Sequence, residues 1–140
     1  MSFAPMPMLV CASVPDSSAW YQRVLGLVSA HGGDEYDQLA AVGPDGPMIV
    51  LQLHHESDEH EFLADPAQPR GGNGVALWFE TTSYGKSLET LRVAMDAGVA
   101  VTVLEDDHVN PTANHREFWL RDPDGYLVVV ASPYGDIDPT

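Results

Sequence analysis

The sequence of 140 residues predicts an α+β fold of two β-α-β-β-β modules whose curved mixed sheets enclose a shared cavity. Three observations predict it. Each half of the chain holds one helical stripe of apolar residues, with one strand-like segment before it and three after it. Turns of glycine, proline and aspartate separate the strands, and an aperiodic acidic stretch with two prolines separates the halves. We therefore expect one domain, with module one over residues 6–55, a connector over residues 56–72 and module two over residues 73–133.

The first module begins with the apolar segment MPMLVCASV, which predicts a buried strand over residues 6–14. Pro15 and Asp16 then supply a turn and a helix N-cap. The apolar stripe after them predicts a helix of about three turns that ends at Gly26. Three strand segments separated by glycine-containing turns follow, over residues 27–31, 36–42 and 48–55.

The second module repeats this order. Residues 75–81 form a predicted strand, and apolar residues at i, i+3 and i+7 predict a helix over residues 83–97, ended by Gly98. The remaining segments are a strand over residues 99–104, a polar loop over residues 105–113, and two strands around a DPDG turn, over residues 114–120 and 126–132.

The charge of the chain restricts its partners. Six Lys and Arg against 21 Asp and Glu give a formal net charge of −15 at pH 7. Such a surface repels phosphate backbones and anionic lipid and attracts cations, so neither nucleic acid nor membrane is an expected partner. Acidity that serves only solubility is the alternative. Cys11 is the single cysteine, which excludes an intrachain disulfide, and its apolar surroundings indicate a buried, inert thiol.

A cytoplasmic location is expected. No apolar run approaches the roughly 20 residues that span a bilayer. The first residues, MSFAPMPMLVCASV, lack the basic start of a secretion signal.

Two stretches of the chain resemble a known superfamily. They are Val14-Pro15-Asp16 ahead of WYQRVLGL at residues 20–27, and FWLRDPDGYLVVVAS at residues 118–132. With the duplicated layout, they make the chain similar to the vicinal oxygen chelate superfamily, which includes glyoxalase I, extradiol dioxygenases, fosfomycin resistance enzymes and bleomycin resistance proteins. The resemblance covers nearly the whole chain and implies a homodimer. Asp16 and Tyr21 are about three residues closer than is usual, which predicts a first helix that starts late or is short.

The resemblance also implies a divalent metal held at four positions of the two modules. Three of them fall on Leu9, Gly74 and Val129, whose side chains bind no metal. Only the fourth offers polar candidates, Gln52 or His54. Because a catalytic metal needs about three protein ligands, no metal cofactor is expected.

Strand alternation predicts which side chains line the cavity, since residues two apart share a face. With the inward face that the resemblance implies, it gives seven candidate ligand-binding residues: Gln52, His54, Trp78, Glu80, His115, Glu117 and Trp119. Leu127, Val129 and Ala131 form an apolar floor, and His55 falls on the opposite face. Tryptophans and carboxylates suit a flat cationic or aromatic organic molecule, through stacking, cation-π attraction and charge pairing.

Three functions agree with these residues. The first is a small-molecule-binding protein similar to bleomycin resistance proteins, which holds such a ligand without a metal and without turning it over. The second is an enzyme: a metal-dependent lyase or dioxygenase whose relocated site uses His54, His115 and Glu117 with zinc, iron, nickel or manganese, or a metal-free enzyme with His54 or His115 as general base. The third is a subunit or regulator whose pocket is filled by its own side chains. In a purely structural role the tryptophans fill the core and the carboxylates pair with arginines, namely Arg70, Arg116 or Arg121.

Overall fold

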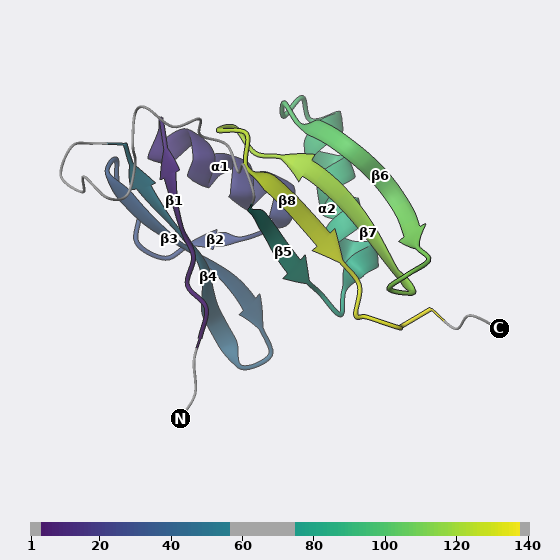
Figure 1. Cartoon of the computed structure of the whole chain (residues 1–140). Coiled ribbons are helices and arrows are strands. Elements are labelled where there is room, and N and C mark those ends of the chain that lie inside the picture. Colours follow the sequence, from purple (N-terminus) through teal and green to yellow (C-terminus); the bar gives the residue numbers. More distant parts are fainter. Residues whose placement is uncertain (1–3, 57–74, 138–140) are drawn as a thin grey trace. The chain divides into compact units, whose positions relative to one another are not determined.

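The computed structural model describes residues 4–56 and 75–137, and the chain divides into two compact units, residues 1–69 and residues 70–140. The described residues of each unit form one four-stranded mixed sheet and one helix, in the order β-α-β-β-β (Figure 1). The predicted α+β fold is therefore confirmed. Neither sheet closes on itself, and the shared cavity stays a prediction. Most of the expected connector and Gly74 lie outside the described residues. Neither described helix is long and apolar enough to cross a membrane.

The first unit has the strand order β1-β4-β3-β2. Strand β1 runs parallel to β4, and the other neighbours are antiparallel. The bounds are β1 Met8–Cys11, α1 Val14–Leu25, β2 Val28–Ser29, β3 Tyr36–Gly43 and β4 Gly46–His55.

Helix α1 begins earlier than the sequence indicated. Its N-cap is Ser13, whose hydroxyl accepts a hydrogen bond from the backbone N–H of Asp16 at 3.2 Å. Pro15 occupies the first turn, where its missing N–H costs nothing. Asp16 therefore lies inside the helix rather than at its cap, and the prediction of a late start was wrong. The length of 12 residues agrees with the predicted three turns. Gly26 ends the helix as predicted, in a left-handed conformation with φ 73°.

A buried aspartate joins α1 to the first sheet. Asp37 accepts hydrogen bonds from the hydroxyls of Ser18 at 2.6 Å and Ser29 at 2.8 Å, and from the backbone N–H groups of Gly32 and Gln38. Burial acts to raise the pKa of Asp37, but these donors outweigh it and hold the pKa below its ordinary value. The carboxylate is thus a charged, fully hydrogen-bonded part of the core.

The contact between Ser18 and Asp37 shows which face of the first sheet is turned toward α1. Asp37 pairs with Leu53, which pairs with Leu9. All three side chains are buried and lie on the helix side. The position that the resemblance assigned to a metal ligand, Leu9, therefore faces the core.

The second unit has the strand order β5-β8-β7-β6, with β5 parallel to β8 and the other pairs antiparallel. Helix α2 packs on the face of the sheet that carries Phe118 and Val130, where the ring of Tyr84 lies 5.8 Å from that of Phe118. The bounds are β5 Ala76–Glu80, α2 Tyr84–Asp96, β6 Thr102–Asn110, β7 His115–Arg121 and β8 Leu127–Ala131.

The polar loop expected over residues 105–113 was wrong, because strand β6 occupies most of this segment. The strand continues to Asn110 and pairs with β7, with His108 opposite Glu117 and Asn110 opposite His115. The register shifts between Val103 and Glu105 and again between Glu105 and His108. Such bulges interrupt side-chain alternation, so the polar segment lacks the period of two that identifies a strand.

Candidate functional site

The candidate residues of the second unit lie on the face of its sheet turned away from α2, which we call the distal face. Trp78 pairs with Val129 and Val129 with Trp119, while Glu80 pairs with Ala131 and Ala131 with Glu117. Since residues two apart share a face, His115 lies on it as well. Five of the seven candidates therefore share one face of the sheet: Trp78, Glu80, His115, Glu117 and Trp119.

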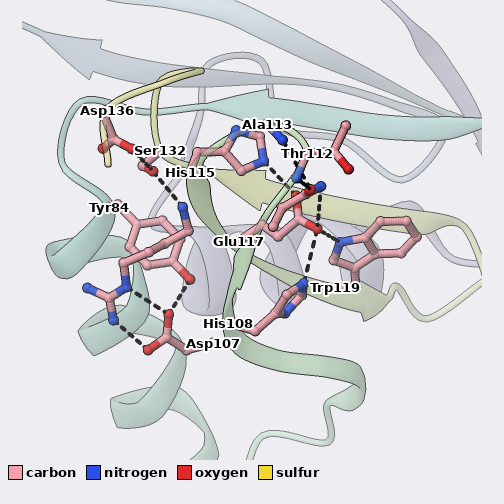
Figure 2. A network of polar contacts seen from close by, with 12 residues as sticks. Tyr84, Asp107, His108, Thr112, Ala113, His115, Glu117, Trp119, Ser132 and Asp136 are labelled. Carbon is pink, nitrogen blue, oxygen red and sulfur yellow. Dashed lines mark hydrogen bonds and ion pairs between the residues drawn. The ribbon is translucent and has the colours of Figure 1, made fainter. Parts of the chain in front are cut away.

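Glu117 is the centre of this surface, and it is only 2% exposed. One carboxylate oxygen, Oε2, accepts from His115 Nε2 at 2.7 Å, while Oε1 accepts from His108 Nε2 at 3.1 Å and from Trp119 Nε1 at 3.0 Å. The amide of Asn110 adds weaker contacts of 3.4 Å to both oxygens. Figure 2 shows Glu117 between the two imidazoles, with the indole of Trp119 beside it. We call these five residues the Glu117 cluster.

The charge of Glu117 follows from its partners. Burial acts to raise its pKa, but hydrogen bonds from His115, Trp119, Asn110 and His108 outweigh burial and lower the pKa below its ordinary value. Glu117 is therefore an ionised carboxylate in the core, and each of its oxygens receives at least one strong donor.

His108 is the cation that balances this charge. Its Nδ1 lies 2.7 Å from the backbone oxygen of Asp106, and its Nε2 faces Glu117. Both partners can only accept, so both ring nitrogens must donate and the ring is an imidazolium. The hydrogen bond to the Asp106 carbonyl raises the pKa of His108. Partial burial acts to lower this pKa, but the Glu117 carboxylate raises it further.

His115 is bonded differently, although it shares the same carboxylate. Its Nε2 donates to Glu117, which assigns the ring proton to that nitrogen. Its Nδ1 is buried and has no hydrogen-bond partner among the described residues. The side chain is almost fully enclosed, at 5% exposure. In its neutral form the ring therefore presents an unused acceptor at Nδ1.

An aromatic pair lies next to this imidazole. The ring of Trp78 is 5.8 Å from that of His115 and 6.4 Å, edge to face, from that of Trp119. Trp119 is anchored by its bond to Glu117, whereas Trp78 is 47% exposed. Such exposure does not fit simple core filling for Trp78. Glu80, also exposed, lies on the same face.

Arg116 and Arg121, the two described arginines among those expected to pair, bind other groups than the candidate carboxylates. Arg116 instead forms a two-point ion pair with Asp107. Asp107 also accepts from the hydroxyl of Tyr84 (Figure 2). Arg121 donates to the backbone oxygen of Gly125, and Arg70 lies outside the described residues. The structural alternative of arginine pairing is therefore wrong for Arg116 and Arg121.

The other two candidates, Gln52 and His54, belong to the first unit and share its face turned away from α1. Both ends of the Gln52 amide are held, since it accepts from the hydroxyl of Tyr36 at 2.6 Å and donates to the backbone oxygen of Met6 at 2.9 Å. His54 lies near Tyr36, with ring centroids 6.3 Å apart, and its Nδ1 is 2.7 Å from the backbone oxygen of His55. His55 itself is on the opposite face, as predicted.

Within the part of the chain that the structure describes, the side chains at the expected positions do not fit the divalent metal that the superfamily implies. In β1 the positions facing away from α1 are Met8 and Val10, which carry neither imidazole nor carboxylate. Val129 is buried and apolar. The Nε2 of His115 already binds Glu117, and the carboxylate oxygens of Glu117 already accept from His115, His108 and Trp119. Within residues 4–56 and 75–137, no group of three or more His, Cys, Asp or Glu is arranged to hold a metal ion.

Two residues of the Glu117 cluster, His108 and Asn110, were not predicted, because both were placed in a loop. The sequence held one signal for a strand here, because His108 and Asn110 are polar residues two apart, as on one face of a strand. Pro111 then follows directly, as expected where a strand enters a hairpin turn.

Comparisons with known proteins agree with this architecture. An integron cassette protein from V. cholerae is 25% identical, covers 94% of this chain and 95% of its own, and has a TM-score of 0.63. A glyoxalase-related enzyme from Fulvimarina pelagi is 16% identical, with coverage of 94% and 88% and a TM-score of 0.69. A glyoxalase/bleomycin resistance protein/dioxygenase from Nocardioides is 18% identical, with coverage of 100% and 91% and a TM-score of 0.65.

No curated protein matches the chain. The family model of the Glyoxalase/Bleomycin resistance protein/Dioxygenase superfamily matches residues 5–130. The chain belongs to this superfamily.

Proposed function

We propose that the protein binds a small organic molecule, a planar aromatic cation, on the distal face of the second unit and without a metal. The observation that supports this most is the position of Trp78, whose half-exposed ring lies against both His115 and the anchored Trp119. A large aromatic side chain that stays half exposed beside an ordered, hydrogen-bonded polar cluster is typical of a recognition surface.

The cluster suits a cation for two reasons. An indole face attracts a cation by about 0.5 to 2 kcal/mol, depending on how far water is removed. The exposed carboxylate of Glu80 lies on the same face and adds a counter-charge, while the net charge of −15 attracts cations over longer distances.

Glu117 has a different role in this proposal. Its charge is already balanced by His108, so it serves to hold Trp119 and His115 in fixed orientations before a ligand arrives. Side chains that are ordered in advance lose less entropy on binding, which improves affinity. The recognition surface is therefore Trp78, Trp119 and Glu80, with Glu117 beneath it.

The proposal is tested with two flat probes of similar size, the cation N-methylquinolinium and neutral quinoline, at a pH where quinoline is uncharged. Isothermal titration calorimetry should show saturable binding of the cation and at least tenfold weaker binding of quinoline, in line with about 1.4 kcal/mol of cation-π and charge interaction. Equal affinities, or no binding of either probe, would count against it.

The superfamily's metal chemistry is tested separately. A metal-dependent lyase or dioxygenase would carry about one equivalent of zinc, iron, nickel or manganese per chain, lost on His54→Ala or His115→Ala. Elemental analysis of purified protein before and after chelation measures this. The proposal expects substoichiometric metal and unchanged probe binding after chelation.

A further inference from the structure

We propose that Nδ1 of His115 accepts a hydrogen bond from the ligand, so that the protein selects planar cations carrying an N–H donor, such as protonated amines, amidines or guanidines, over quaternary ammonium ions. This inference rests on the proposed function and narrows its ligand class.

The bonding of His115 leaves one acceptor free for this task. The carboxylate of Glu117 fixes the proton on Nε2 at 2.7 Å, so the lone pair of the neutral ring is on Nδ1. That atom is buried and has no partner within residues 4–56 and 75–137. Buried polar groups without a partner are uncommon because they have lost water without gaining a hydrogen bond. An external donor would satisfy the atom.

The second ring nitrogen distinguishes His108 from His115. His108 bonds to the same carboxylate, yet its second nitrogen is already used by the backbone oxygen of Asp106. The two rings therefore differ in function: His108 balances the charge of Glu117, and His115 keeps an acceptor. A carboxylate that orients one imidazole nitrogen so that the other can act on a ligand is a common arrangement in binding and catalytic sites.

Trp78 gives the ligand its route to His115. Its ring lies against the imidazole and is itself half exposed. Exposed side chains change rotamer within nanoseconds, so Trp78 can turn from His115 and stack on a flat ligand whose N–H reaches Nδ1. The recognition then combines one ring face with one directed hydrogen bond.

The test uses a matched pair of cations: 4-aminoquinolinium, which is protonated and carries N–H donors at neutral pH, and its fully N-methylated analogue, 1-methyl-4-(dimethylamino)quinolinium. Calorimetry on the wild-type protein should show about tenfold tighter binding of the N–H cation, the difference that one hydrogen bond supports. The variant His115→Phe keeps a flat ring without a nitrogen acceptor and should bind both probes alike.

A second measurement does not depend on a variant. In protein labelled with ¹⁵N-histidine, the Nδ1 resonance of His115 should have the position of a bare imidazole nitrogen. It should move when 4-aminoquinolinium is added and stay when the methylated analogue is added. Equal wild-type affinities, an unmoved Nδ1 resonance, or a preference that survives in folded His115→Phe would each overturn the inference. If neither cation binds, the proposed function fails and the inference fails with it.

Discussion

Glu117 accepts hydrogen bonds from two histidines through different oxygens, His115 on Oε2 at 2.7 Å and His108 on Oε1 at 3.1 Å. The two strands that supply these residues, β6 and β7, pair with His108 directly opposite Glu117. One buried carboxylate thus accepts from the imidazolium of His108 on one side. On the other side it accepts from His115, whose second ring nitrogen has no partner among the described residues. This arrangement is the basis of the recognition surface and of the first two predictions.

Replacing the shared carboxylate should destabilise the second unit. In Glu117→Gln, the amide NH₂ group, itself a donor, replaces an oxygen that accepted hydrogen bonds from the neighbouring rings. The positive charge of His108 also loses its carboxylate partner. The expected loss is about 3 kcal/mol in the free energy of unfolding, as for a broken buried ion pair. Urea denaturation measures it. The control Glu80→Gln, on the same face but exposed, should stay within about 0.5 kcal/mol of wild type. Equal effects of the two variants would contradict the central position of Glu117.

His108 should make stability fall on the alkaline side. Because folding raises the pKa of His108 above its ordinary value of 6.5, the charged ring stabilises the fold fully below pH 6.5. This contribution is lost as the pH rises through the higher folded pKa. Urea denaturation across this range should show the decline in wild type and a flatter profile in His108→Gln. A matching decline in the variant would show that another group is responsible.

Asp37 should make stability fall on the acidic side. Its pKa in the folded chain is below the ordinary 3.8, so its stabilisation is present above that value and is lost as the pH falls through the lower folded pKa. Acid unfolding of Asp37→Asn should therefore depend less on pH than that of wild type, at lower stability throughout. Asp45→Asn, at an exposed turn, is the control and should leave the acid profile unchanged.

The two helix caps predict a difference between two serines. Ser13 accepts the Asp16 N–H, whereas Ser83, at the start of α2, makes no side-chain cap bond. Ser13→Ala should cost about 1 kcal/mol of unfolding free energy, and Ser83→Ala should cost less. Thermal or urea denaturation of both variants measures the difference, and a larger loss at Ser83 would contradict the capping assignment.

The sequence predicted the fold well where apolar periodicity and turn residues act together. Helix α2 was placed within one residue at each end, and the DPDG turn correctly separated β7 from β8. Alternation also placed Trp78, Glu117 and Trp119 on one face, because the pairing of β5, β8 and β7 has no register shift.

What the sequence could not give depends on tertiary pairing. The bulges of β6 removed the alternation that would have identified it, so His108 was placed in a loop and its contact with Glu117 was missed. The protonation states of His108 and His115 depend on their hydrogen-bond partners, which no local pattern encodes. Glu117 was predicted to be a carboxylate facing the ligand, whereas the structure engages it with four donors.

The most direct test of the proposed function is thermal protection by N-methylquinolinium in wild type, in Trp78→Ala and in the Trp78→Ala/Trp119→Ala double variant. Tyr134→Ala, which removes an aromatic ring that is 77% exposed outside the distal face, is the control. We predict that the cation raises the melting temperature of wild type and of the control equally. The rise should be smaller in Trp78→Ala and absent in the double variant. Undiminished protection of the folded double variant would contradict the assignment of the distal face as the binding site.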